Sequence, residues 1–297
     1  MRSKHIILSI VLCLAATSII LYLSTNDQDL SRYNNDWNGT SHFFTLTDRH
    51  LSYDVYNLTS LSKAFNSTLL LLAPERNYEP VEILAYSNFL KSGNTIILAD
   101  DFGTGNSFLK GIGSNISIVS GILTSADRAY NDSHSIVAYP TDYNHTILSG
   151  IETLVMNKAA SLLYGEPLAT SSLFSWIDKD KDKLITKKEI LGKYTVIAFE
   201  KIGDGEIIVI SDPSIFINSM INLEEKWDNK KFISNIISLN PNLYIDQTNS
   251  KTYKLDTINK IFVYLKSIKE IKILFIGMIL FLLAYVFLMS PYFKNKK

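Results

Sequence analysis

The amino-acid sequence predicts an α/β domain with a mostly parallel sheet, flanked by an N-terminal and a C-terminal transmembrane helix. The flanking helices follow from two apolar runs, residues 6–23 and 273–289, at the two ends of the 297-residue chain. The α/β domain follows from the short continuous apolar runs that alternate with helical patterns between them. Buried parallel strands and their connecting helices produce this alternation.

The terminal apolar runs contain no charged residue and are close to the hydrocarbon thickness of a bilayer, at about 26 Å as helices. We predict a cytoplasmic N-terminus at residues 1–5 and a signal anchor at residues 6–23. A cleaved signal peptide is the alternative, although its apolar region is usually only about 7–15 residues long. A second span at residues 271–290 precedes a basic cytoplasmic tail at residues 291–297. The chain is thus predicted to be a two-pass cell-membrane protein with an extracytoplasmic domain at residues 24–250.

A strand, helix and strand are predicted in the first third of that domain. Residues 69–72 and 95–99 are short apolar runs typical of strands covered on both faces. Apolar residues recur at helical spacing over residues 81–89, and Gly93 is of the type favoured just past a helix C-terminus. A strand, helix and strand over about 30 residues form a right-handed βαβ unit of a parallel sheet.

Later segments add a hairpin and two helices. Residues 194–199 and 206–210 are apolar runs joined by a Gly-Asp-Gly turn, which indicates a β-hairpin. Residues 228–239 predict a closing helix, and residues 251–270 a juxtamembrane helix or stalk with an apolar face. Residues 111–170 are harder to interpret, and at least one strand and one helix are expected there.

Charge and cysteine content exclude some classes of function. All 29 acidic residues lie between positions 26 and 270 with only 23 of the 29 basic residues, so this region carries a net charge of −6. Nucleic acid is therefore not an expected partner, because phosphate binding needs a basic face. The single cysteine, Cys13, lies within the first apolar run, so the domain has no disulfide and no nucleophilic thiol.

The sharpest motif is DKDKDKLITKKE, residues 178–189, which has carboxylates at positions one, three, five and twelve of a calcium-binding loop. The predicted ligands are the side chains of Asp178, Asp180, Asp182 and Glu189, the carbonyl of Leu184, and Thr186 directly or through water. Ile185, at position eight, is expected to pack the loop against its support. The predicted cofactor is therefore a structural Ca²⁺, and no nucleotide or redox cofactor is expected.

A solvated turn is the alternative interpretation of this loop. Lys183 stands at position six, where calcium loops use glycine, and a left-handed lysine costs about 1 kcal/mol. The lysines between the aspartates also reduce the local negative potential. Against this, aspartate at three alternate positions with glutamate at the twelfth is unlikely to arise from composition alone.

A second candidate site is ADDFGTGNS, residues 99–107, where a predicted parallel strand ends and a helix begins. Ligands in open α/β sheets bind at this carboxyl edge, where glycines let the backbone approach a ligand closely. The candidate ligand-binding residues are Asp101, Gly103, Thr104, Gly105, Asn106 and, from a later turn, Asn218. The alternative is a tight turn in which Asn106 or Ser107 caps the helix. The third glycine of a dinucleotide motif and the lysine of a P-loop are both missing.

Asp212 follows the strand at residues 207–210 and is expected at the same edge, where it could face Asp100. Together with Asp101 these residues are the candidate catalytic group of a cysteine-independent hydrolase. Acid–base work by such a pair needs a histidine or a further carboxylate nearby, and His134 and His145 are the only histidines after Gly93. The sequence contains neither a G-x-S-x-G nor an H-E-x-x-H motif.

Four short motifs carry a resemblance to a known family: WNGTS at 37–41, APERNY at 73–78, ADDFGTGN at 99–106 and SDPSIFINSM at 211–220. They resemble an uncharacterised family of prokaryotic, mainly archaeal, membrane proteins with a domain of unknown function. The resemblance implies a flavodoxin-like sheet of the class I glutamine-amidotransferase type, with helices on both faces. It also implies partners in cell-envelope complexes, because relatives often occur beside MoxR-type ATPases and surface-assembly proteins. Amidotransferase chemistry is not implied, since it needs a cysteine nucleophile.

The function expected from the sequence is a non-catalytic ligand- or protein-binding module of a cell-envelope complex, anchored in the membrane. The alternative is the cysteine-independent hydrolase, acting on a glycan or peptide. An enzyme needs an enclosed pocket with a perturbed acid or base, whereas a binding module needs only a complementary surface.

Overall fold

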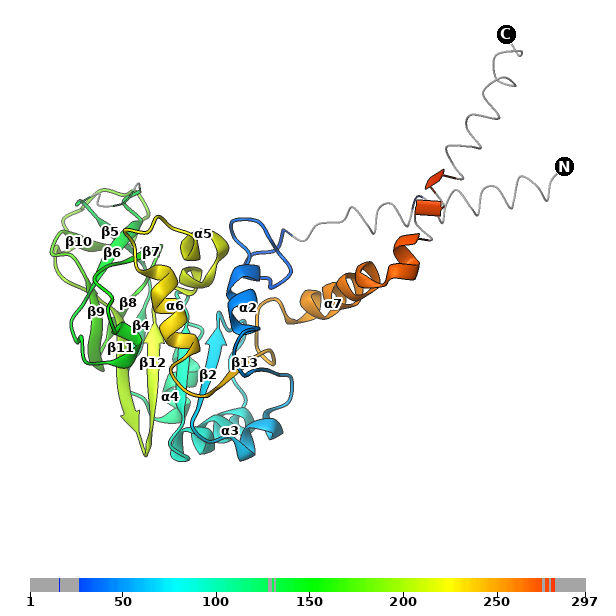
Figure 1. Cartoon of the computed structure of the whole chain (residues 1–297). Coiled ribbons are helices and arrows are strands. Elements are labelled where there is room, and N and C mark those ends of the chain that lie inside the picture. The colour runs from blue at the N-terminus through cyan, green and yellow to red at the C-terminus, as the bar shows by residue number, and fades with distance from the viewer. Residues whose placement is uncertain are drawn as a thin grey trace, which may run out of the picture. The chain divides into compact units, whose positions relative to one another are not determined.

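Residues 16, 27–127, 130, 132–273, 276–277 and 279–280 are described by the structure, which is a computed structural model. By its contacts the chain divides into two units. One is Asp27–Tyr253, and the other consists of residues 1–26 together with residues 254–297. All described strands lie in the larger unit (Figure 1).

One mixed sheet of 11 strands organises this unit. Its parallel half runs, in spatial order, through β1 (Ser52–Val55), β13 (Asn242–Asp246), β2 (Ser67–Leu72), β3 (Thr95–Ala99) and β12 (Gly205–Ile210). Its antiparallel half continues through β11 (Thr195–Ile202), β9 (Glu166–Ser171), β6 (Ser135–Pro140) and β7 (Leu154–Asn157). In addition, β8 (Ser161–Leu163) pairs with β11, and β4 (Ser117–Val119) pairs with β8. The strands β5 (Ile122–Ser125) and β10 (Ser175–Asp178) form a separate antiparallel pair.

Helices cover both faces of the parallel half. On one face lie η1 (Leu58–Lys63), α3 (Pro80–Lys91) and α4 (Asn106–Ile112), and on the other lie α2 (Ser41–Thr47), α5 (Asn218–Ile221) and α6 (Asn229–Ile237). The remaining short turns are η2 (Thr146–Leu148) and η3 (Pro213–Phe216). Successive side chains of β2 point to opposite faces of the sheet and enter two hydrophobic cores. Leu70 packs with α2 and α6, whereas Leu69 and Leu71 pack with α3 and α4.

The locally encoded elements are confirmed. The βαβ unit is β2, α3 and β3, with β2 and β3 parallel, and α3 ends before Gly93, whose φ is 79°. Glu79 and Glu82 form a capping box at the start of α3, with Pro80 at its first position. The hairpin is β11 and β12, paired antiparallel, and the closing helix is α6. The predicted helix after the domain is α7 (Tyr253–Ser267).

The prediction of a flavodoxin-like, mostly parallel sheet is wrong. Four strand pairings are parallel, and the antiparallel pairings outnumber them. The reason lies in the described residues between Gly113 and Ser171, which form β4 to β9 and, as helix, only the three-residue 3₁₀ turn η2. Parallel neighbours need a crossover of a dozen or more residues, usually a helix. Strands without such crossovers pair antiparallel.

The predicted membrane topology is also contradicted. Among the described residues, no helix is both long enough and apolar enough to cross a membrane. The longest candidate near a predicted span, α7, has 15 residues and includes Lys254, Asp256, Lys260 and Lys266. This finding corrects the two-pass cell-membrane assignment, its signal anchor, its transmembrane helices and its extracytoplasmic main domain. Most of residues 6–23 and 271–290 lies outside the described residues.

Candidate functional site

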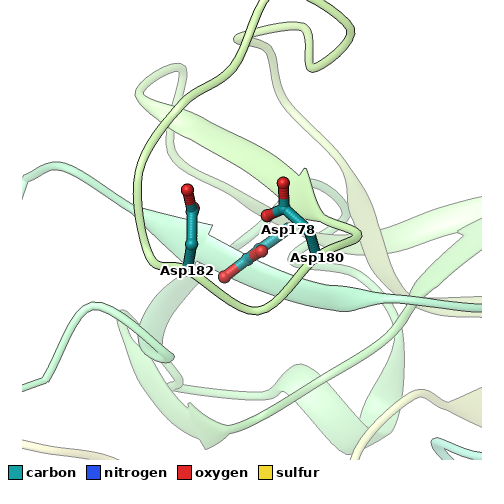
Figure 2. A group of neighbouring side chains, drawn as sticks. All are labelled: Asp178, Asp180 and Asp182. Carbon is teal, nitrogen blue, oxygen red and sulfur yellow. The ribbon is translucent and has the colours of Figure 1, made fainter.

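The candidate calcium loop, residues 178–189, leaves the end of β10. Asp178 is the last residue of that strand, pairs with Ile122 of β5 and is fully buried. Asp180 and Asp182 follow on the exposed part of the loop. Carboxylate oxygens of these three residues all lie within 4.8 Å of one another, and Figure 2 shows the three side chains gathered at the curve of the loop. The alternate spacing in the sequence therefore does bring the three aspartates together.

The backbone of the loop makes the turn that this convergence needs. Lys181 and Lys183 adopt the left-handed conformation, with φ of 65° and 63°. Oδ1 of Asp178 accepts a hydrogen bond from the N–H of Lys181 at 2.6 Å, and Oδ2 accepts one from the N–H of Lys183 at 3.0 Å. Oδ1 of Asp182 accepts one from the N–H of Leu184 at 2.7 Å. Position six thus has the left-handed backbone of a calcium loop, although a lysine occupies it.

Glu189 closes the loop rather than joining the three aspartates. Its carboxylate accepts hydrogen bonds from the N–H of Lys179 at 3.0 Å and of Thr186 at 2.9 Å, and these bonds lower its pKa. Among the described residues, it is not part of the carboxylate group within 4.8 Å. The expectation for Ile185 is wrong: its side chain is 47% exposed, so it does not pack the loop against its support.

His134 belongs to the site and was not predicted from the sequence. Its Nε2 lies 3.0 Å from Oδ2 of Asp178, and both side chains are buried. Nearby, Nζ of Lys183 donates to Oδ2 of Asp132 at 2.8 Å. Burial raises the pKa of Asp178, but hydrogen bonds from His134 and from the N–H of Lys183 outweigh it and lower the pKa. The turn before β6 therefore contacts the loop through His134 and Asp132 and stabilises its conformation.

Mutual repulsion of the three aspartates favours a cation between them, although five lysines against four carboxylates give residues 178–189 a net charge of +1. Desolvation raises the pKa of Asp180, and the negative charge of Asp182 raises it further. Carboxylates held this close repel one another unless a proton or a cation lies between them.

At the carboxyl edge of the sheet, Asp100 and Asp101 follow β3, and Asp212 follows β12. Ala99 pairs with Ile210, and the N–H of Asp100 donates to the carbonyl of Ile210 at 3.1 Å. Continuing this register places Asp101 beside Asp212 on one face and Asp100 on the other, because side chains alternate along a strand. The negative charge of Asp101 raises the pKa of Asp212, which agrees with that placement. The strand register and the pKa of Asp212 thus favour Asp101 over Asp100 as the neighbour of Asp212.

Two of these three aspartates hold turns of the backbone. Asp100 accepts hydrogen bonds from the N–H of Phe102 at 3.1 Å and of Gly105 at 2.7 Å. Asp212 accepts from the N–H of Ser214 at 2.7 Å and of Asn157 at 2.7 Å. The carboxylates of Asp100 and Asp212 therefore stabilise the backbone at the ends of β3 and β12.

The pKa values of the adjacent pair are strongly perturbed. Burial raises the pKa of Asp101 to about 6, with a further contribution from Asp100, while Lys251 and Lys158 oppose the shift. Burial raises the pKa of the fully buried Asp212 to about 7, and Asp101 adds to the shift. Oδ1 of Asp101 is buried and accepts no hydrogen bond from the described residues. Asp101 is therefore the member of the group with an oxygen still available.

The glycine turn after β3 is mostly committed to its own packing. A Cβ on Gly105 would lie 2.7 Å from Cδ2 of Leu98, so a larger residue there would require the side chain of Leu98 to shift. The side chain of Asn106 is bonded to the backbone of Ile118 in β4, through both its Nδ2 and its Oδ1, and does not cap α4. Gly103 and Thr104, both partly exposed, are the residues of this turn that remain open to a ligand.

Within the described part of the chain, Asn218 forms its side-chain hydrogen bonds with the segment before and at the start of α2, and none of them is to the glycine turn. It is 3% exposed, and its Nδ2 donates to the carbonyls of Asn34 at 3.1 Å and Asp36 at 2.7 Å. Its Oδ1 accepts from the N–H of His42 at 2.9 Å. These bonds fasten the segment before α2 to α5, which gives Asn218 a structural role.

Comparisons with known proteins identify a family and only remote structural likenesses. The family model described as "Domain of unknown function (DUF4350)" matches residues 32–237. No curated protein sequence matches the chain. The N-terminal domain of mmIFT52 is 14% identical, with 63% of this chain and 79% of that chain covered at a TM-score of 0.43.

Two further structures from bacteria show similar remoteness. The β-galactosidase from Bacillus circulans sp. alkalophilus is 9% identical, with 59% of this chain and 23% of that chain covered at a TM-score of 0.38. Cytoplasmic protein STM1381 from Salmonella typhimurium LT2 is 6% identical, with 68% and 87% covered at a TM-score of 0.40. Likenesses this remote carry no functional argument.

Proposed function

Because the chain belongs to the DUF4350 family, whose function is unknown, we propose a function from the site itself: a non-catalytic binding module whose loop at residues 178–189 binds calcium. The observation that supports this most is the convergence of Asp178, Asp180 and Asp182 within 4.8 Å on one turn. Oxygen ligands from carboxylates are those that Ca²⁺ prefers.

The donor set fits a calcium ion. Oδ2 of Asp178 is occupied by the N–H of Lys183 and by His134, but Oδ1 of Asp178 and Oδ1 of Asp182 accept one backbone N–H each and keep a second lone pair for a metal. The proposed ligands are the three aspartates, the carbonyl of Leu184, Thr186, and Glu189 through its remaining lone pairs. A bound Ca²⁺ would neutralise the clustered carboxylates and hold the two ends of the loop together.

The proposed partner of the module is a protein, and the family resemblance favours one from a cell-envelope complex. Nucleic acid is not proposed, because the region between positions 26 and 270 carries a net charge of −6. At the glycine turn, Asp101, Gly103 and Thr104 are the residues proposed to meet a small ligand.

Calcium titration of the purified full-length protein, followed by thermal unfolding, tests this proposal. The variant Asp178→Asn, Asp180→Asn removes two ligands, and the matched control Asp48→Asn, Asp204→Asn removes the same charge at exposed positions elsewhere. We expect calcium to raise the Tm of the wild type and the control but not of the loop variant. A calcium effect that the loop variant retains would place the ion elsewhere and refute the proposal.

A hydrolase is the second candidate, and the Asp101–Asp212 pair is the observation that favours it. Their pKa values of about 6 and about 7 suit a general acid and base near neutral pH. Chromogenic glycosides and peptides are the substrates to test. Turnover that Asp101→Asn abolishes and Asp48→Asn retains would establish the hydrolase over the binding module.

A further inference from the structure

Six large apolar side chains are exposed around the calcium loop. Their exposed fractions lie between 47% and 74%, and they are Leu173, Phe174, Leu184, Ile185, Ile190 and Leu191. Single exposed apolar side chains are common on protein surfaces, but a concentration within so short a segment marks an interaction site. By contrast, Trp176 in the same segment is only 4% exposed.

One closed excursion of the chain carries four of the six, and Leu173 and Phe174 immediately precede it. An antiparallel bridge joins Ser175 to Gly192, and the N–H of Gly192 donates to the carbonyl of Ser175 at 2.9 Å. Within this closure, Glu189 ties Lys179 to Thr186 through its carboxylate. The four side chains within the closure therefore belong to the same closed loop as the three aspartates, and Leu173 and Phe174 stand at its entrance.

The outside of this excursion is basic. Six exposed lysines lie in this segment or just after it: Lys179, Lys181, Lys183, Lys187 and Lys188 between the apolar residues, and Lys193 after Gly192. Lys183 pairs with Asp132, and no ion pair within the described part of the chain involves the other five. Of the acidic residues of the segment, Asp178 and Glu189 are buried and Asp180 and Asp182 are exposed, so the exposed lysines outnumber the exposed carboxylates.

We propose that these six apolar residues and six lysines form a docking surface for an acidic, leucine- or phenylalanine-bearing segment of a partner protein. Charge complementarity selects this occupant: a second copy would bring lysines against lysines, whereas an acidic segment meets them with opposite charge. The inference rests on the proposed function, because bound calcium keeps the aspartates from competing with the partner for the lysines.

A synthetic peptide of glutamate, alanine and leucine, with its leucines at helical spacing, is the probe. Fluorescence anisotropy measures its binding to the full-length protein in about 10 mM calcium, well above the 0.1–1 mM dissociation constants of weak extracellular sites. Two control peptides replace glutamate by lysine or leucine by serine. The surface variants are Lys187→Glu, Lys188→Glu and, separately, Leu184→Ser, Ile190→Ser. Their matched controls are Lys63→Glu, Lys91→Glu and Val81→Ser, Leu84→Ser, at exposed positions of η1 and α3.

We expect the acidic peptide to bind, both surface variants to bind it about tenfold more weakly or worse, and the matched controls to leave binding unchanged. Equal binding by the surface variants, or by either control peptide, would overturn the inference. Binding to phosphatidylglycerol vesicles without binding to the peptide, or a dimer in sedimentation, would also overturn it. If calcium stabilises the wild type in each of these cases, the docking inference fails while the calcium proposal stands. No calcium effect at all refutes the proposed function first.

Discussion

Replacing Asp212 by asparagine should change how the stability of the protein depends on pH. Asp212 is fully buried, and its pKa of about 7 compares with about 3.9 for an aspartate in an unfolded chain. The folded state therefore holds a proton that the unfolded state releases between those two values. The contribution of Asp212 to the free energy of unfolding is largest below about pH 4, falls as the pH rises, and levels off above about pH 7.

The size of that fall follows from the shift. Three pKa units correspond to about 4 kcal/mol of unfolding free energy between pH 4 and pH 8, as an order of magnitude. Asparagine cannot ionise, so this dependence disappears in the variant. It also loses one acceptor for the N–H of Ser214 or Asn157, at a cost of about 1 kcal/mol. The variant should be less stable than the wild type at pH 4 and about 3 kcal/mol more stable at pH 8.

Urea unfolding at pH 4, 6 and 8 measures this difference, and Asp228→Asn is the matched control. Asp228 also accepts two backbone N–H bonds, from Glu152 and Thr153, but it is partly exposed. The control should show no gain in unfolding free energy over the wild type at pH 8, because Asp228 is not a fully buried carboxyl group. An Asp212→Asn variant whose unfolding free energy stays below that of the wild type at pH 8 would refute the argument that Asp212 is held protonated.

Three further changes have definite expected outcomes. Lys181→Gly should raise the free energy of unfolding by up to about 1 kcal/mol, because Lys181 has a φ of 65°, which glycine adopts without strain. The control Lys179→Gly should lower the free energy of unfolding, and thermal unfolding of the two variants measures the difference. Gly205→Ala should destabilise by several kcal/mol, because the new Cβ would lie 2.3 Å from the carbonyl oxygen of Leu90; a variant that unfolds at the wild-type urea concentration would contradict this. Asn218→Ala should lower stability by about 2–3 kcal/mol, because it leaves buried backbone groups without hydrogen-bond partners. It should also speed hydrogen exchange at the N–H of His42, which donates to Asn218. Unchanged exchange there would show that other contacts hold the segment before α2.

The sequence was sufficient for elements whose contacts are local. The unit β2, α3 and β3 and the hairpin of β11 and β12 were predicted because strand runs, helical spacing and turn glycines lie within a few dozen residues of one another. Apart from β11, the antiparallel half was missed because the pairing of its strands depends on which distant strand each one meets.

The candidate site was likewise predictable only where its residues are close together in the sequence. Alternate spacing was enough to predict that Asp178, Asp180 and Asp182 converge, whereas His134 is 44 residues away and carries no local signal. The pairing of Asp101 with Asp212 depends on the register between β3 and β12, and a slip of one residue exchanges the faces of a strand. That dependence is why the sequence alone favoured Asp100 as the partner of Asp212.

Equilibrium dialysis of the full-length protein against radioactive calcium tests the central claim most directly. We expect one bound ion per chain, with a dissociation constant of about 1 mM or lower. The Asp178→Asn, Asp180→Asn variant should lose that ion, and the Asp48→Asn, Asp204→Asn control should keep it. No ion bound at about 10 mM calcium, or an ion that the loop variant still binds, would contradict a calcium site at residues 178–189.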